Sequence, residues 1–463
     1  MAPEQARWWS WRRQRLDRTA RGVEDALHSV VALSSANPSA PLSLLARVPR
    51  MLQGMYEGAT MHRTAVRLPA MRRAVWLLAA DTAHIPFHAC RGTGVNEQTL
   101  LRRTGVSSEY WNELRARILQ VCERPMDARE IKSAVGGDDE KTSAVLSVLA
   151  STGEVVRVRA PSLFSNAFAF ASTEAWIGSP LPAMPRDDAL TFLAGDYLQA
   201  YGPITVDDFV WWSGIPRNRC EPALEAHEPV RLDDGYVLWP AHARAFEQSR
   251  SVANRVNLLP AWDAYPMGYL DRSRLGEPEA VELAFDRAGN SLPIILVEGR
   301  IGGLWDFRMS RAGTLTVTIR LFDSAGERIW EAVEAEASAV ASLFQARSLS
   351  IVRERAARAT RVVEVPHAPQ KAPPKVVRRK IPRKKRPGKV AASKKRVAKT
   401  STSPRKAGAS KARVISRKAP PRKTIPSKSA PVKAGRTTKK PAATKKPATI
   451  RSSKARQSKT RKR

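Results

Sequence analysis

The basic residues of this 463-residue chain are concentrated at one end. Residues 371–463 hold 36 of the 79 Lys and Arg residues and 11 of the 33 Pro residues, with no Asp, Glu or aromatic residue. Residues 1–370 hold 43 basic and 43 acidic residues, so the net charge of +36 belongs wholly to the C-terminal segment. Such a segment cannot bury enough apolar surface to offset the entropy lost on folding. We therefore predict a neutral folded body, a linker over residues 351–370 and a disordered basic tail over residues 371–463.

The body has the composition of a globular protein. It contains all 12 Trp, all 7 Tyr and all 11 Phe residues, and its length suits about two to three domains. It has no apolar run of about 18 residues and no signal-peptide pattern at its start. Cys90, Cys122 and Cys220 form neither a disulfide framework nor a zinc motif. We expect a cytoplasmic protein with no membrane partner.

The first 185 residues contain mostly helical patterns. Residues 4–90 indicate helices separated by short loops, including a fully apolar stretch at 74–80 that should be buried. Asp127 with Glu130 three residues later is a helix-start signature. A second helix over 141–151 and a strand from Val155 follow. Helix, turn, helix, strand is the order of a winged helix-turn-helix.

The same order recurs further along the chain. Thr205 with Asp208 begins a helix, Pro216 opens the next, and residues 230–239 indicate a hairpin. We predict an α+β fold built from tandem winged-helix units over residues 1–95, 96–185 and 186–250.

The last part of the body changes from helical to strand periodicity. A hairpin is predicted over 293–307, a strictly alternating strand over 314–322 and an amphipathic helix over 325–346. We interpret residues 251–350 as a small antiparallel β-barrel-like domain closed by a helix.

Several segments of the body, in order and spacing, resemble the AlkZ/YcaQ family of winged-helix DNA-binding proteins. Their order and spacing extend over nearly all of residues 10–345 and leave the tail outside; the segments are 32–38, 41–48, 55–57, 70–76, 202–205, 211–214, 258–272 and 295–305. The resemblance implies three winged-helix units and a β-barrel curved around DNA. It also implies kinship with monofunctional DNA glycosylases that remove bulky alkylated bases and unhook interstrand crosslinks.

The resemblance breaks down at the catalytic motif. Family enzymes place Gln-x-Gln or Gln-x-Asp just before the proline that matches Pro38. The aligned positions here are Ser34 and Ala36, and a shift by one residue gives Ser35 and Asn37. Because alanine cannot position water or stabilise a sugar cation, the sequence favours a binding protein over an enzyme. Ser34 and Asn37 are the candidate catalytic residues if activity survives.

Two groups of body residues are candidate DNA contacts. Arg217, Asn218 and Arg219 begin the second helix of a predicted helix-turn-helix, whose N-terminal residues commonly reach DNA. A solvated helix face explains them equally well. Arg72 and Arg73 lie in a segment of the family resemblance, which favours DNA contact over a purely solvated role.

Other polar residues have simpler explanations than catalysis. Asp263 and Asp271 suit turns or pairing with Arg272 and Arg274 better than a carboxylate pair. His84 and His88, with Asp81 and Cys90 nearby, superficially suggest a metal site. Pro86 disfavours a regular helix that would place both histidines on one face. We predict no metal and no cofactor.

The tail requires a polyanionic partner. Its charges should bind DNA strongly, without sequence preference and with a steep salt dependence. It resembles the Lys/Pro/Ala-rich tails of linker histones. The candidate tail contacts are Arg378, Arg379, Lys380, Arg383, Lys384, Lys385, Arg386, Lys394, Lys395 and Arg396.

The leading functional hypothesis is a DNA-binding protein of the AlkZ-like winged-helix family, located on the nucleoid, whose body recognises the shape of double-stranded DNA or a lesion in it. Its tail holds the protein on DNA and could bind other nucleic acids. One alternative is a DNA glycosylase with a variant motif around Ser34 and Asn37. A second is a transcriptional regulator or a chromosome-compacting protein without catalysis. No feature of the sequence specifies an oligomeric state.

Overall fold

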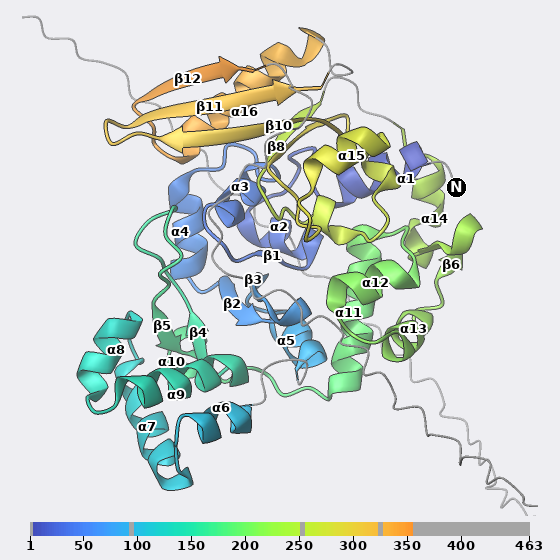
Figure 1. Ribbon diagram of the computed structural model, residues 1–463. Coiled ribbons are helices and arrows are strands. Elements are labelled where there is room, and N and C mark those ends of the chain that lie inside the picture. Colours follow the sequence, from blue (N-terminus) through green and yellow to red (C-terminus); the bar gives the residue numbers. More distant parts are fainter. Residues whose placement is uncertain (1–2, 92–96, 251–254, 323–326, 355–463) are drawn as a thin grey trace, which may run out of the picture. The chain divides into compact units, whose positions relative to one another are not determined.

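The computed structural model describes residues 3–91, 97–250, 255–322 and 327–354, all within one compact unit of the chain, residues 1–376 (Figure 1). The predicted tail, its ten candidate DNA contacts from Arg378 to Arg396 and most of the predicted linker lie outside the described residues. In the described part, no helix is both long and apolar enough to span a membrane.

Sixteen α-helices are present among the described residues. They are α1 (Pro3–Arg13), α2 (Val23–Val30), α3 (Ser39–Leu45), α4 (Gln53–Met61), α5 (His84–Cys90), α6 (Glu97–Arg103), α7 (Ser108–Val121), α8 (Ala128–Val135), α9 (Asp139–Thr152), α10 (Thr173–Ile177), α11 (Arg186–Tyr201), α12 (Val206–Ser213), α13 (Arg217–Glu225), α14 (Ala243–Glu247), α15 (Pro278–Ala284) and α16 (Trp330–Leu343).

The same part of the chain contains twelve strands, which confirms the α+β class. They are β1 (Leu33–Ser34), β2 (Ala65–Pro69), β3 (Val75–Ala79), β4 (Val155–Arg157), β5 (Phe170–Ser172), β6 (Val230–Arg231), β7 (Val237–Leu238), β8 (Val256–Leu259), β9 (Ile294–Val297), β10 (Arg300–Met309), β11 (Thr314–Leu321) and β12 (Ser348–Arg353).

The first sheet has the order β1-β3-β2-β4-β5 and is antiparallel throughout. The prediction of helices alone over residues 4–90 is therefore wrong, because residues 74–80 supply strand β3. A short apolar run has no periodicity that separates a buried strand from a buried helix. The predicted burial is right in part: Leu77, Leu78 and Ala79 are almost inaccessible to solvent, whereas residues 74–76 and 80 are half-buried. The sheet also joins strands from both sides of the boundary predicted at residue 95.

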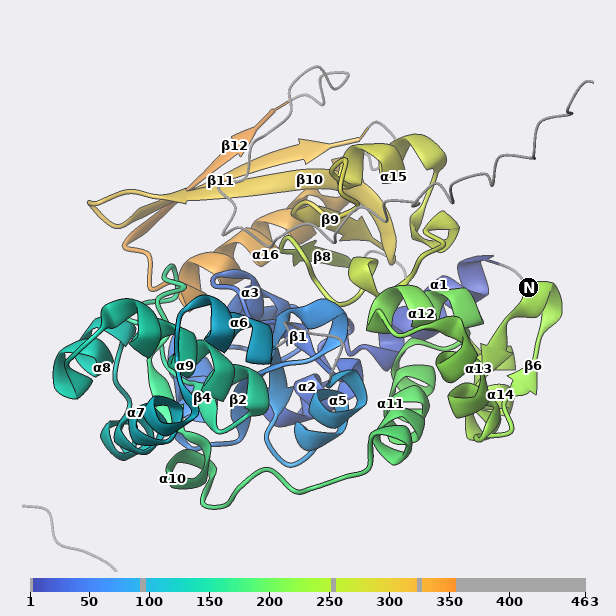
Figure 2. The ribbon, with the colours of Figure 1, turned by 60° about the horizontal axis from the view of Figure 1, so that its bottom comes forward.

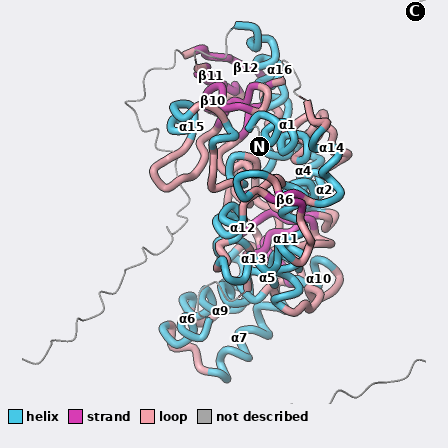
Figure 3. Tube along the Cα trace, turned by 90° about the vertical axis from the view of Figure 1, so that its right-hand side faces the viewer, coloured by secondary structure: helices cyan, strands magenta, loops and turns pink. Residues whose placement is uncertain are grey.

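Both predicted helix starts are confirmed as capping boxes. At Asp127 and Glu130, and again at Thr205 and Asp208, each side chain accepts a hydrogen bond from the other residue's backbone N–H. In each case two helices and then two antiparallel strands follow, α8–α9 with β4–β5 and α12–α13 with β6–β7. Figure 3 shows α6, α7 and α9 grouped together at the bottom of the view, and their side chains share an apolar cluster that includes Leu114, Ile118 and Leu149. That these groups are winged-helix units remains a prediction.

The second sheet corrects the predicted barrel. Its order is β12-β11-β10-β9-β8, and its two end strands do not pair, so it is an open sheet. The hairpin of β9 and β10 is confirmed, but β12 was missed and runs parallel to β11. Helix α16 makes this possible because it carries the chain back along one face before β12 begins (Figure 2). Strand β12 also extends to Arg353, inside the predicted linker.

The first sheet has an apolar core on each face. Leu33 and Leu77 belong to a cluster that includes the second sheet and α16. Val66, Leu68 and Leu78 belong to another cluster, shared with α11 and α12. Successive strand residues point to opposite faces, so this sheet is clamped between two cores.

Candidate nucleic-acid interface

Asn37 lies in the loop between β1 and α3, and its peptide bond to Pro38 is cis. Its buried amide Nδ2 donates to the carbonyl oxygens of Ser162, at 3.3 Å, and Ser165, at 2.9 Å. Its Oδ1 accepts from the Tyr56 hydroxyl at 2.9 Å. Both N–H donors of the amide are therefore engaged, and one acceptor position remains.

A second asparagine completes the contact between the two loops. Asn166 belongs to residues 159–168, the connection from β4 to β5. Its Oδ1 accepts from the Asn37 backbone N–H at 2.8 Å, and its Nδ2 donates to the Asn37 carbonyl oxygen at 3.2 Å. The N-terminal loop and the 159–168 loop thus behave as one hydrogen-bonded structure.

Tyr56 on α4 connects Asn37 to a buried arginine on β2. Arg67 donates to the Tyr56 hydroxyl and to the Val158 carbonyl oxygen, and its guanidinium carbon lies 4.3 Å from the ring centroid of Phe168. Burial raises the pKa of Tyr56, so its hydroxyl keeps its proton and donates to Asn37. Neither Arg67 nor Tyr56 was singled out from the sequence.

Ser34 and Ala36 occupy the aligned motif positions. Ser34 is buried opposite Trp76, and its Oγ accepts from the Ala36 backbone N–H at 3.4 Å. Residues 33–38 contain no carboxylate. A general base needs an available basic atom within hydrogen-bonding distance of water. This loop offers only the hydroxyls of Ser34 and Ser35 and the Asn37 amide, which is already held by protein contacts.

Arg72 and Arg73 form the tip of the β2–β3 hairpin, and both have positive φ, 52° and 61°. The Nε of Arg72 donates to the Trp211 carbonyl oxygen at 2.6 Å, and its guanidinium carbon lies 3.5 Å from the centroid of the Trp211 ring. Arg72 therefore ties the hairpin to α12. Arg73 is exposed, and its side chain has no ion-pair partner in the part of the chain that the structure describes.

The arginines at the start of α13 are already paired. Arg217 Nη1 lies 2.8 Å from Asp207 Oδ1, and Arg219 forms an ion pair with Asp187. Asn218 between them is exposed. The structure thus places all three at the N-terminus of a helix, as predicted, with carboxylates beside the two cations.

The segments that build the first sheet are rich in arginine and poor in acidic residues. Residues 31–80 and 155–173 together contain eight arginines and one acidic residue, the exposed Glu57 on α4. Of these arginines only Arg47 forms an ion pair within the described residues. Five are exposed: Arg50, Arg63, Arg72, Arg73 and Arg159. In a body of zero net charge, this segregation gives the sheet and its loops a positive potential.

The buried Arg47 pairs with a carboxylate that the sequence had assigned to a turn or to other arginines. Asp263 accepts two hydrogen bonds of 2.8 Å from Arg47, and both side chains are inaccessible to solvent. Asp271 accepts from the backbone N–H and hydroxyl of Ser273 and from the Tyr236 hydroxyl. Arginine pairing is thus correct for Asp263, with a different partner, and a turn role is correct for Asp271.

His84 and His88, the two histidines considered as a metal site, both lie on helix α5. Pro86 falls in the first turn of α5, where it is tolerated, so the expected disruption of the helix from His84 to Cys90 was wrong. His88 Nε2 lies 2.9 Å from the Pro182 carbonyl oxygen.

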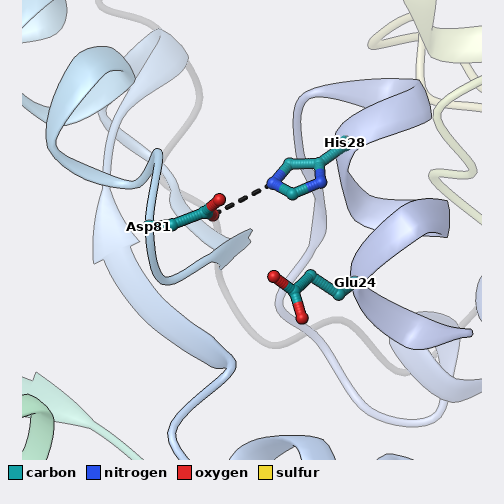
Figure 4. Close-up of side chains that lie close together, drawn as sticks. All are labelled: Glu24, His28 and Asp81. Atoms are coloured by element: carbon teal, nitrogen blue, oxygen red, sulfur yellow. Dashed lines mark hydrogen bonds and ion pairs between the residues drawn. The ribbon is translucent and has the colours of Figure 1, made fainter. Parts of the chain in front are cut away.

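Elsewhere Glu24, His28 and Asp81 bring one ligand atom each within 4.8 Å of one another (Figure 4). All three are exposed, and His28 Nε2 lies 3.0 Å from Asp81 Oδ1. A surface ion pair accounts for this group.

The sequence profile of the family described as DNA glycosylase AlkZ-like matches residues 27–343. The chain belongs to this family, and the resemblance inferred from its sequence is confirmed. Among solved structures, the chain is similar to the Streptomyces sahachiroi DNA glycosylase AlkZ, at 20% identity and a TM-score of 0.61. That similarity covers 76% of this chain and 100% of the other. No curated protein matches the sequence.

Proposed function

We propose that the body binds double-stranded DNA through the first sheet and its loops, without excising bases. The carrying observation is the segregation of eight arginines, with Glu57 as the one acidic residue, onto residues 31–80 and 155–173, which build this sheet. DNA binding is driven by phosphate neutralisation, and arginine matches phosphate geometry well. Membership in the AlkZ-like family supports DNA as the partner.

Three observations support binding without catalysis. The side chain of Ala36 has no polar group. Both N–H groups of the Asn37 amide donate to the carbonyl oxygens of Ser162 and Ser165. Residues 33–38 contain no carboxylate. Removal of a base requires stabilisation of a developing sugar cation and activation of water. A glycosylase using Ser34 and Asn37 would have to break contacts that hold the loop together.

The experiment is a lesion-panel assay with the full chain. Duplexes carrying alkylated bases or interstrand crosslinks are incubated with the protein, and both binding and abasic-site formation are measured. The proposal predicts retention of the DNA with no abasic product. Product that disappears in Asn37→Ala or Ser34→Ala would establish the glycosylase alternative instead. A defined genomic footprint would favour a transcriptional regulator.

The body's contribution is tested by matched arginine variants. Arg73→Ala removes an exposed cation that has no ion pair among the described residues, so affinity for duplex DNA should fall. The slope of log affinity against log salt should decrease by about one phosphate contact. Arg217→Ala should have a smaller effect, because Asp207 already neutralises that side chain. Equal losses in both variants would contradict the assignment of the interface to the first sheet.

We propose that the basic tail adds a non-specific electrostatic anchor and associates the protein with the nucleoid. This proposal rests on the tail's composition, 36 basic residues without a single acid.

A further inference from the structure

The 159–168 loop contains a tight turn, residues 162–165, that carries an exposed aromatic residue. The backbone N–H of Ser165 donates to the Ser162 carbonyl oxygen at 3.2 Å, which closes a four-residue turn. Leu163, at the second position, is 4% exposed and packs into the core. Phe164, at the third, is 45% exposed. Leu163 thus fixes the turn to the core, whereas the neighbouring Phe164 is partly exposed to solvent.

Asn37 clamps this turn at both ends. The carbonyl oxygens that accept from its Nδ2 belong to Ser162 and Ser165, the first and last residues of the turn. Asn166, directly after the turn, exchanges two further hydrogen bonds with the Asn37 backbone. The polar side chain next to the family's motif position therefore fixes the loop that carries Phe164.

The inner edge of the Phe164 ring rests on the body. Its centroid lies 4.8 Å from that of Phe344, which follows α16, and 6.4 Å from that of Phe307 on β10. These contacts restrict the ring while nearly half of the residue stays accessible. A ring held in this way binds a flat partner with little further loss of conformational entropy.

The segment that carries the turn is basic, which favours a polyanionic partner. The turn lies within residues 155–173, which contain Arg157 and Arg159 and no acidic residue. By contrast Phe192, which is 54% exposed on α11, shares its helix with Asp187 and Asp188. An exposed aromatic ring on an arginine-bearing segment without acids suits a nucleic acid, whose bases stack on such rings while cations contact the phosphates.

We propose that Phe164 is a nucleobase contact, which stacks on a base that is unpaired or displaced from the helix, and that Asn37 is its positioning residue. This inference rests on the proposed DNA-binding function and deepens it, because it assigns a preference for locally unpaired DNA. In this role Asn37 contributes to DNA recognition indirectly, because its hydrogen bonds hold the 159–168 loop in the shape that presents Phe164.

The test measures the ratio of affinities of the full chain for a bulged duplex and for the same duplex fully paired. The sequence-independent contribution of the tail cancels in this ratio. The wild-type protein should prefer the bulged DNA, and Phe164→Ala should lower its affinity for that DNA about tenfold, the scale of one base–aromatic stacking contact. Its salt slope should stay unchanged, because no charge is lost. Phe164→Trp should retain the preference, and Phe192→Ala is the matched control that should behave as wild type.

Asn37→Ala distinguishes positioning from general stability. It should lower the preference for the bulged DNA in the wild-type background and have no further effect on it in the Phe164→Ala background. Thermal unfolding of every variant shows whether the fold is retained.

A wild-type protein that does not bind DNA overturns the proposed function and this inference together. A protein that binds both DNAs equally, or whose preference survives Phe164→Ala, overturns the inference alone. So does an equal loss in Phe192→Ala.

Discussion

At the scale of single residues, the fully buried pair of Arg47 and Asp263 determines how the N-terminal segment is attached to the rest of the body. Arg47 donates two hydrogen bonds of 2.8 Å to Asp263, 216 positions away, and neither side chain is accessible to solvent. Asp263→Ala leaves a buried guanidinium without its counter-charge. We expect the free energy of unfolding to fall by about 3 to 5 kcal/mol, as measured by urea denaturation.

The surface pair of Arg217 and Asp207 is the matched control for this prediction. Asp207→Ala should cost less than about 1 kcal/mol, because solvent screens exposed pairs. Similar losses in Asp263→Ala and Asp207→Ala would show that the buried pair contributes no more than a surface one.

Asp196 on α11 gives a residue-scale prediction for pH. Burial raises its pKa to about 6, against smaller opposing effects of His28 and His227. Because the folded state holds this proton more tightly than the unfolded state, its contribution to stability is present at low pH and is lost as the pH rises through about 4 to 6. Asp196→Asn should therefore gain about 1 to 2 kcal/mol over wild type at pH 8.

The advantage of Asp196→Asn should shrink as the pH falls and largely disappear near pH 3, below the ordinary pKa of 3.8, where the wild-type carboxyl is mostly protonated in both states. Urea midpoints at the two pH values measure this. A variant that parallels wild type over the whole range would show that the folded protein leaves this carboxyl as well hydrated as the unfolded chain does.

At the scale of elements, Gly214 controls the docking of the β2–β3 hairpin on α12. It ends α12 with a φ of 72°, and a Cβ there would lie 3.3 Å from the Cα of Arg72. Gly214→Ala should destabilise the protein by about 1 kcal/mol through its backbone conformation. The variant should lose further stability because the added Cβ displaces Arg72 at the tip of the β2–β3 hairpin.

Gly178 separates the two contributions to that loss. It has a φ of 87°, and a Cβ added there would meet no atom within 4 Å, so Gly178→Ala carries the conformational cost alone. The larger loss of melting temperature is expected for Gly214→Ala. If both variants melt alike, the hairpin does not depend on close contact with α12.

At the scale of the whole molecule, charge separates the two modes of DNA binding that we propose. A chain that ends at Gln370 loses 36 basic residues and keeps a body with zero net charge. We expect a large loss of affinity for undamaged duplex DNA and a much shallower salt slope, because counterion release scales with the phosphates neutralised. Binding measured across a salt series tests this, and unchanged affinity and slope would contradict the role of the tail.

Much of the local structure followed from the sequence because its causes are local. Asp127 with Glu130 and Thr205 with Asp208 mark capping boxes within four residues of chain, and the alternation over 314–322 predicts strand β11. Residues 74–80 and strand β12 were missed for the opposite reason. Whether a short apolar segment becomes a strand depends on which strand it pairs with, and β12 exists only because α16 returns it to β11.

The sequence by itself determined the division into a neutral body and a basic tail, the family resemblance and the loss of the glutamine motif, since each can be counted along the chain. Only the tertiary structure decided what the remaining polar residues do. It pairs Arg217 and Arg219 with carboxylates, leaves Arg73 exposed, and turns Asn37 into the clamp of a loop more than 120 residues away. Charge composition adds along a chain, whereas the use of a hydrogen-bonding group depends on which distant atoms folding brings within about 3 Å.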